Sequence, residues 1–128
     1  MIEKAGYRVA DPESLETPVM VVYEERVNHN IRALSELVGG GDNLMPHVKT
    51  HKAEAVARKQ VESGVVGFKC ATLSEAEMAL SAGGIEVVLS YPLTQRIKAE
   101  RFADLAAQHG DALVVVLPDQ RRRRVRLW

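Results

Sequence analysis

Apolar runs recur along this chain at a regular interval, and this regularity most limits the possible folds. The runs begin near residues 44, 65, 86 and 112, so that successive starts are 21, 21 and 26 residues apart. Each interval also holds one stretch with the apolar spacing of a helix. Strict alternation of strand and helix implies parallel strands joined by right-handed crossovers. We therefore expect an α/β fold.

Two α/β architectures are compatible with this spacing: a small doubly wound sheet, or the N-terminal half of a (β/α)₈ barrel of about 250 residues. A nucleotide-binding sheet would carry a glycine-rich loop directly after a strand. The triple glycine at 39–41 instead precedes the strand expected near residue 44. The half barrel, with parallel strands alternating with helices, is therefore the favoured architecture.

The boundaries of the expected elements follow from the same patterns. Residues 1–16 are a polar lead-in with at most one helical turn, whereas Thr17–Tyr23 is β-branched and apolar, as in a buried strand. Later strands are expected at 44–49, 65–71, 85–90 and 112–117, and helices at 27–38, 53–64, 74–83 and 94–109. Ser74 with Glu77 fits a capping box, and Thr94 is expected to cap the helix that follows it.

The segment Leu44–Lys52 ends an apolar run in a lysine flanked by two histidines. Side chains alternate along a strand, so His47 and Lys49 are expected on one face, about 7 Å apart. A lysine at the carboxyl end of a parallel strand is well placed to form a Schiff base with a carbonyl ligand. The alternative is a surface turn with two solvated cations. Pro46 counts against an inner strand, because proline offers no N–H to the ladder.

Charge is distributed unevenly along the chain. There are 17 basic and 17 acidic residues, but five of the basic residues lie between 121 and 126, which leaves 12 basic against 17 acidic over the first 120 residues. Residues 118–128 therefore form a basic tail, which we interpret as a truncated or frame-shifted end, or as an ordinary solvated tail. A nucleic-acid-binding tail is disfavoured, because the body is acidic and no aromatic residue interleaves the arginines.

The single cysteine, Cys70, excludes an internal disulfide and is consistent with a reducing compartment. The N-terminus lacks the basic and then apolar order of a signal peptide, and no apolar stretch approaches the length of a membrane span. We therefore expect a cytoplasmic protein that contacts neither membrane nor nucleic acid.

Three strings of the sequence resemble one known family in order and spacing: residues 17–22 (TPVMVV), 46–52 (PHVKTHK) and 70–77 (CATLSEAE). They are similar to the D-threonine aldolase and D-serine dehydratase family, which belongs to the alanine-racemase-like pyridoxal-phosphate enzymes of fold type III. The resemblance covers about residues 15–117. It implies that residues 17–117 are part of a pyridoxal-phosphate-binding barrel.

By this resemblance Lys49 is the residue that holds pyridoxal 5′-phosphate covalently, and His47, His51 and Tyr91 are further candidate cofactor contacts. The strand at 17–23 would cross to a C-terminal β domain, which in full-length relatives carries the ligands of a divalent metal. Those ligands would lie beyond Trp128, so no metal site is expected here. The full-length form is expected to be a homodimer.

The resemblance implies a pyridoxal-phosphate-dependent lyase that acts on β-hydroxy D-amino acids, by retro-aldol cleavage or by dehydration. Two alternatives remain open: a non-catalytic half-barrel remnant, and an amino-acid racemase-like pyridoxal-phosphate protein. Members of the family are more than twice as long as this chain. We therefore expect the 128 residues alone to be inactive and to self-associate through open strand edges.

Overall fold

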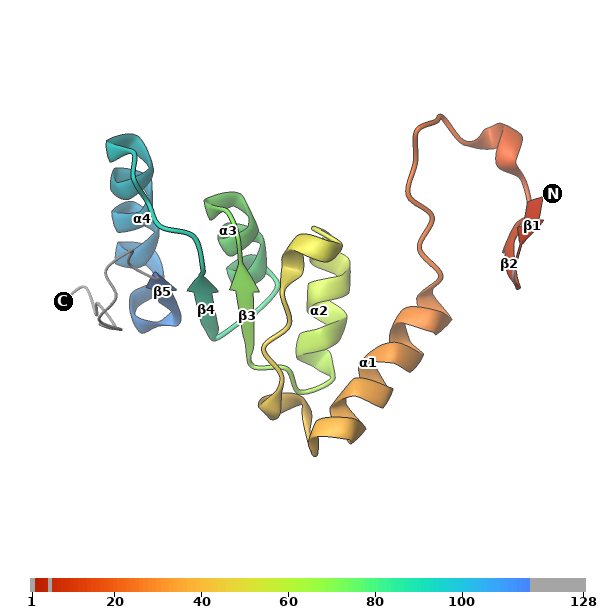
Figure 1. Cartoon of the computed structure of the whole chain (residues 1–128), viewed down its shortest axis with the longest axis horizontal. Coiled ribbons are helices and arrows are strands. Elements are labelled where there is room, and N and C mark those ends of the chain that lie inside the picture. The colour runs from red at the N-terminus through yellow and green to blue at the C-terminus, as the bar shows by residue number, and fades with distance from the viewer. Residues whose placement is uncertain (1, 5, 116–128) are drawn as a thin grey trace.

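The computed structural model describes residues 2–4 and 6–115 (Figure 1). Its helices are α1 (Glu24–Val38), α2 (Glu54–Glu62), α3 (Leu73–Ser81) and α4 (Arg96–His109), with short 3₁₀ helices η1 (Pro12–Ser14), η2 (Gly41–Asn43), η3 (Val48–Thr50) and η4 (Gly110–Ala112). Its strands are β1 (Ile2–Lys4), β2 (Tyr7–Val9), β3 (Gly67–Cys70), β4 (Glu86–Leu89) and β5 (Leu113–Val115). The predicted basic tail at 118–128 lies outside the described residues. Within the described part, no helix has the length and apolarity that crossing a membrane requires.

Three strands form one parallel sheet in the order β3-β4-β5 (Figure 1). Phe68 lies beside Val87 in the register, and Val87 lies beside Leu113. The helix α3 connects β3 to β4 and packs against both, and α4 connects β4 to β5. The predicted alternation of parallel strands and helices is therefore confirmed, and all three strands fall inside their predicted ranges.

The core lies between one face of this sheet and the helices. The strand side chains that point to this face are buried, among them Phe68, Val87 and Leu89. Helices supply most of the remaining core residues, namely Ala57 from α2, Leu73, Ala76, Ala79 and Leu80 from α3, and Phe102 and Leu105 from α4. On the other face of the sheet Lys69 is exposed and Val88 is partly exposed. The described sheet is therefore closed on one face and open on the other.

Two glycines stand where another residue would be strained or would clash. Gly39 stops α1 in the left-handed conformation, with φ 81°, and donates its N–H to the carbonyl of Glu36 at 3.2 Å. Gly84 follows α3 where the backbone closes on the core, and a Cβ there would lie 2.9 Å from Cδ2 of Phe68 and 3.0 Å from the carbonyl oxygen of Ala79. A larger residue at 84 would therefore displace the core.

The prediction of a buried strand at Thr17–Tyr23 is wrong. Residues 19–22 lie outside any strand, and their apolar side chains are exposed, from 44% for Val21 to 64% for Met20. β-Branched residues favour extended backbone, but a strand also needs a partner for its N–H and C=O groups. None of the described residues pairs with this segment, which arches away from the parallel sheet before α1 (Figure 1).

The prediction of a strand at 44–49 is also wrong. Only His47 forms an isolated parallel bridge, with Lys69 of β3, and the chain then turns into η3. Pro46 lacks the N–H that a continuing ladder requires, although its carbonyl accepts the N–H of Lys69 at 2.9 Å. The segment is therefore docked on the sheet at one point.

Two predicted helix caps are misplaced. Helix α3 begins at Leu73, so its N-cap is Thr72, whose Oγ1 accepts the N–H of Glu75 at 3.2 Å. Thr72 and Glu75 have the same three-residue spacing as the predicted pair, Ser74 and Glu77, but they lie two residues earlier in the chain. Spacing alone did not distinguish the two pairs. Helix α4 begins after Gln95 and has no side-chain cap, so the predicted cap at Thr94 is wrong as well.

The N-terminal lead-in contains more structure than its polar sequence predicted. Strands β1 and β2 pair antiparallel, with Ile2 beside Val9, and Gly6 turns between them with φ 78°. The ring of Tyr7 packs edge-on against Tyr23, with 5.0 Å between the centroids. This contact links the hairpin to the residue just before α1.

Phe68→Ala tests the described core. The Phe68 side chain has no exposed surface, so its removal is expected to lower the free energy of unfolding by about 3–5 kcal/mol. Ile97→Ala is the matched control, because Ile97 is 73% exposed on α4 and its loss should change stability by less than about 0.5 kcal/mol. Chemical denaturation followed by circular dichroism measures both. Similar losses for the two variants would contradict the described packing.

The open face and the exposed segment at 19–22 predict that the 128-residue chain self-associates. Apolar surface and unpaired strand edges together favour contacts between copies. Sedimentation velocity across a tenfold concentration range should show the mean sedimentation coefficient rising with concentration. A single monomeric species throughout that range would show that these surfaces are covered within one chain.

Candidate active site

Lys49 lies in η3, directly after the single point at which its segment contacts the sheet. His47 is level with Lys69 in the parallel register, so Lys49, two residues later, lies at the carboxyl end of β3. Val48 between them is fully buried and anchors the turn, whereas Lys49 and Thr50 are exposed. The segment therefore presents an amine at the end of a parallel sheet where α/β proteins bind ligands.

The 3₁₀ turn changes the predicted relation between His47 and Lys49. Instead of two strand side chains about 7 Å apart, His47 accepts the backbone N–H of Lys49 on Nδ1 at 3.3 Å. The hydroxyl of Thr50 donates to the carbonyl of His47 at 3.2 Å, which closes the turn. The structure therefore brings His47 and Lys49 together, as expected, through a local turn rather than through strand alternation.

The pKa of His47 is lowered, first by burial and then by the neighbouring Lys49 ammonium. Lys69 acts in the same direction, while the carboxylate of Glu75 opposes both. Because Nδ1 accepts the Lys49 amide proton, the neutral ring carries its own proton on Nε2. His47 is therefore a neutral imidazole with a donor available beside the lysine.

Glu75 is the residue of this region that the sequence did not single out. Its side chain is only 6% exposed, and Oε2 accepts the N–H of Ala71 at 2.8 Å. Oε1 lies 3.5 Å from Nζ of Lys52, which itself stands in the left-handed region with φ 49°. The carboxylate thus connects the start of α3 to the segment that carries Lys49. A Thr-x-x-Glu capping pattern at Thr72 was the available signal.

His51 points into a different environment from Lys49. Its Nδ1 accepts the N–H of Ala53 at 3.1 Å at the start of α2, and its ring lines a hollow together with Tyr23 and Val56. Nε2 is buried, and it has no hydrogen-bond partner among the described residues. Burial lowers the pKa of this imidazole. Its role as a cofactor contact stays a prediction.

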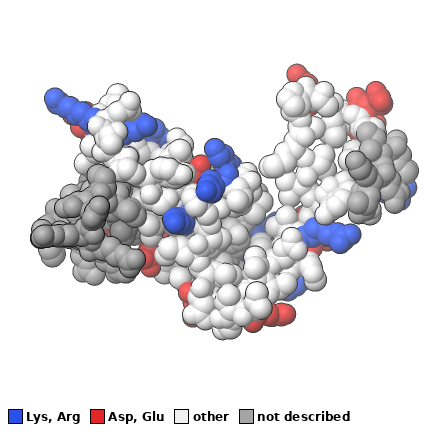
Figure 2. All heavy atoms as spheres, viewed as in Figure 1, with Lys and Arg blue, Asp and Glu red and all other residues white. Residues whose placement is uncertain are grey.

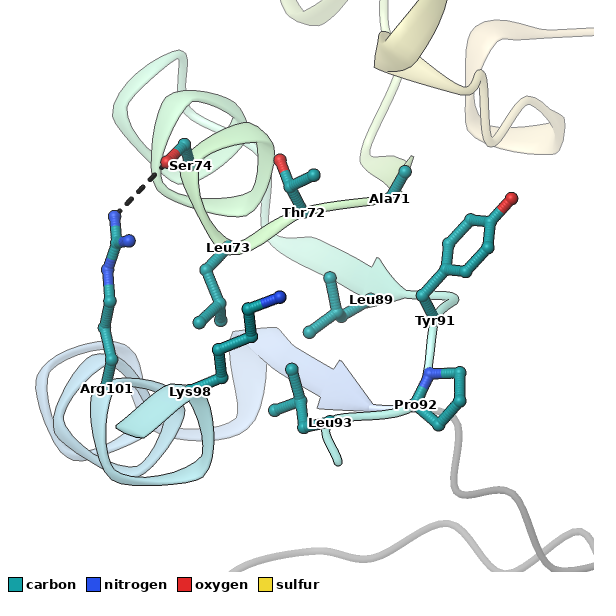
Figure 3. A pocket seen from close by; sticks show the side chains of 10 residues that line it. All are labelled: Ala71, Thr72, Leu73, Ser74, Leu89, Tyr91, Pro92, Leu93, Lys98 and Arg101. Carbon is teal, nitrogen blue, oxygen red and sulfur yellow. Dashed lines mark hydrogen bonds between the residues drawn. The ribbon is translucent and has the colours of Figure 1, made fainter. Parts of the chain in front are cut away.

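Tyr91 lies on the rim of a hollow of about 270 Å³ at the carboxyl ends of β3 and β4 (Figure 3). The floor is apolar, and the Lys98 ammonium points into the hollow, while Arg101 reaches from α4 to Ser74. Lys49 and His47 do not line this hollow. Tyr91 and Lys49 therefore do not line the same hollow, and the predicted ring contact remains a prediction.

The described residues contain no group of three or more histidine, cysteine or carboxylate side chains that could hold a metal ion. Cys70 is fully buried, and burial raises the pKa of its thiol to about 12, which leaves it protonated and unreactive. The chemistry available in this region is therefore that of an exposed amine next to a neutral imidazole.

The parallel strand and helix alternation, with a lysine at the carboxyl end of the sheet, defines an α/β barrel portion with an amine site. The sequence matches the alanine racemase, N-terminal domain family over residues 22–123. The chain therefore belongs to this family, whose fold is the N-terminal half of a barrel, and the predicted architecture is confirmed. No curated protein sequence gave a significant match.

The crystal structure of D-threonine aldolase from Filomicrobium marinum is similar to this chain, with a TM-score of 0.69 and 31% sequence identity. The alignment covers 82% of this chain and 28% of the aldolase chain. This chain therefore spans little more than a quarter of the length of that protein. The suspected relationship to the N-terminal portion of this family is confirmed.

His51→Asn tests the burial of the imidazole. A lowered pKa means that the folded state resists protonation, so this contribution to stability is present above the ordinary pKa of 6.5 and is lost as pH falls through the folded value. Unfolding free energies measured between pH 5 and 7.5 should rise with pH, and less steeply in His51→Asn, whose amide oxygen can still accept the Ala53 N–H. An unchanged slope in His51→Asn would show that His51 titrates as freely as in the unfolded chain.

Proposed function

We propose that this chain is the cofactor-bearing part of a pyridoxal-phosphate-dependent lyase that acts on β-hydroxy D-amino acids, with Lys49 as the amine that binds the cofactor aldehyde. The observation that carries the proposal is the position of Lys49, exposed at the carboxyl end of a parallel sheet beside His47. Membership of the alanine racemase N-terminal domain family and the similarity to a D-threonine aldolase support it.

The residues present fit the aldehyde end of pyridoxal phosphate. The Lys49 side chain makes no hydrogen bond or ion pair with the described residues, so an incoming carbonyl does not have to displace a partner. The neutral ring of His47 offers an N–H donor without adding positive charge, which suits contact with a bound aromatic ring. When bound, the cofactor supplies an electron sink for bond cleavage at the substrate Cα.

A free Lys49 amine can also act as a base toward the reacting carbon of the substrate. A lysine that leaves a carbonyl adduct stays beside the reacting carbon, where it can accept or return a proton. Glu75 holds the chain around this position by binding the Ala71 amide and approaching Lys52. The carboxylate therefore positions the segment and does not itself face the ligand.

Covalent trapping tests the assignment of Lys49. Pyridoxal phosphate added to the protein and reduced with borohydride should leave a pyridoxyl group that peptide mapping finds on Lys49. The variant Lys49→Arg should lose this label, because guanidinium does not form the reducible adduct, while Lys59→Arg should keep it, since Lys59 binds Glu24 elsewhere. A label mainly on Lys52 would contradict the assignment.

Products distinguish the possible reactions on D-threonine. Retro-aldol cleavage gives glycine and acetaldehyde, dehydration gives 2-oxobutanoate and ammonia, and inversion at Cα gives L-allo-threonine. Because one face of the described sheet is open, we expect the 128-residue chain alone to form none of these at a measurable rate. Turnover by this chain would show that its 128 residues contain a complete site.

A further inference from the structure

A second lysine lies on the open face of the sheet, one strand away from the Lys49 segment. Lys69 is the register partner of His47 in the parallel bridge and of Val88 in β4. Neighbouring strands are about 4.8 Å apart, and register partners in a parallel pair point to the same side. His47, Lys69 and Val88 therefore form one row across this face.

Burial confirms the direction of the Lys69 side chain. Its neighbours Phe68 and Cys70 are fully buried against the helices, whereas Lys69 is exposed. Because successive side chains of a strand point to opposite faces, Lys69 must project from the face opposite the core. This is the inner face of the half barrel, at whose carboxyl end Lys49 lies.

Positive charge gathers at this end of the sheet without a matching carboxylate. Among the described residues neither Lys49 nor Lys69 forms an ion pair, and the nearby Glu75 is already engaged by Lys52 and the Ala71 amide. The parallel bridge between His47 and Lys69 and the hydrogen bond from the Lys49 amide to the His47 ring place both lysines next to the same residue, and both lower the pKa of its imidazole. Figure 2 shows both basic and acidic side chains on the half of the molecule toward which β3 and β4 point in Figure 1.

We propose that Lys69 is a second binding residue of the Lys49 site, and that its ammonium holds an anionic oxygen of the ligand whose aldehyde reacts with Lys49. The inference rests on the proposed function, since it assumes that Lys49 is the reacting amine. An anion bound between the two lysines supplies the counter-charge that the described residues lack. Pyridoxal phosphate offers two such oxygens next to its aldehyde, on the phosphate and on the ring.

Lysine variants provide the test. The wild-type chain, Lys69→Met, Lys69→Arg and the control Lys98→Met are incubated with increasing pyridoxal phosphate, reduced with borohydride and mapped, so that weak adducts are captured. Lys98 carries the same charge, but it lies on α4 and points into the hollow that Tyr91 borders. Lys69→Met should raise the concentration for half-maximal labelling of Lys49 about tenfold, as expected for a lost hydrogen bond to a charged group. Lys69→Arg should restore most of the affinity, and Lys98→Met should behave as wild type.

Pyridoxal, which lacks the phosphate, identifies the oxygen. If Lys69 holds the phosphate, Lys69→Met weakens the labelling by pyridoxal phosphate alone. If Lys69 holds the ring oxygen, labelling by both aldehydes weakens equally. If wild type and Lys69→Met label Lys49 equally with both aldehydes, the role of Lys69 is overturned and the proposed function stands. If the label in the wild-type chain is found on Lys69 itself, both are overturned.

Pyridoxine 5′-phosphate, which has no aldehyde, separates the two hypotheses further. Its equilibrium binding, measured by titration calorimetry, should weaken in Lys69→Met. If Lys49 is never labelled but this binding still depends on Lys69, the proposed function fails and the oxyanion site stands. If the wild-type chain neither becomes labelled nor binds pyridoxine phosphate, both are overturned.

Discussion

The side chains of Phe68, Val87 and Leu89 pack against helices on one face of the parallel sheet, and the rest of the described structure follows from this packing. Once these positions are buried, the two-residue period of a strand leaves Lys69 and Val88 on the opposite face. A shift of register by one residue would bury Lys69 without a partner, which costs several kcal/mol. The hydrophobic core therefore determines where the polar groups of the site are placed.

The sequence predicted the parts of the fold that depend on periodicity. Each of β3, β4 and β5 is a short, mainly apolar run that follows a helix, and each lies where its run was found. Such a run is buried by the helices next to it in the sequence, so its burial can be predicted without knowing which strand pairs with it. The same reasoning failed for Thr17–Tyr23, whose apolar pattern resembles that of the other strands. A strand pattern shows that a segment suits a sheet, but it does not identify the neighbour.

The candidate site was predictable in its composition but not in its geometry. The resemblance of residues 46–52 to a known family led to Lys49, and the structure places His47 next to it, as expected. Strand alternation was the wrong reason, because Pro46 interrupts the ladder and the chain turns into η3. Glu75 was missed, since its capping pattern overlaps with a second pattern of the same spacing and its link to Lys52 spans 23 residues. Only a folded structure reveals that kind of contact.

The charge state of His47 beside Lys49 depends on how strongly the Glu75 carboxylate acts on its imidazole. Its carboxylate is buried, and one of its oxygens lies 3.5 Å from Nζ of Lys52, which offsets part of its negative charge. The opposing influence on His47 is therefore outweighed by burial and by the Lys49 ammonium, and the imidazole stays neutral. If Glu75 were instead free beside His47, the ring would be protonated more readily, and a third positive charge would join the two lysines. Burial and the Lys49 ammonium, which lower the pKa of His47, thus keep a neutral hydrogen-bond donor next to an exposed amine, a combination suited to holding an aldehyde ligand.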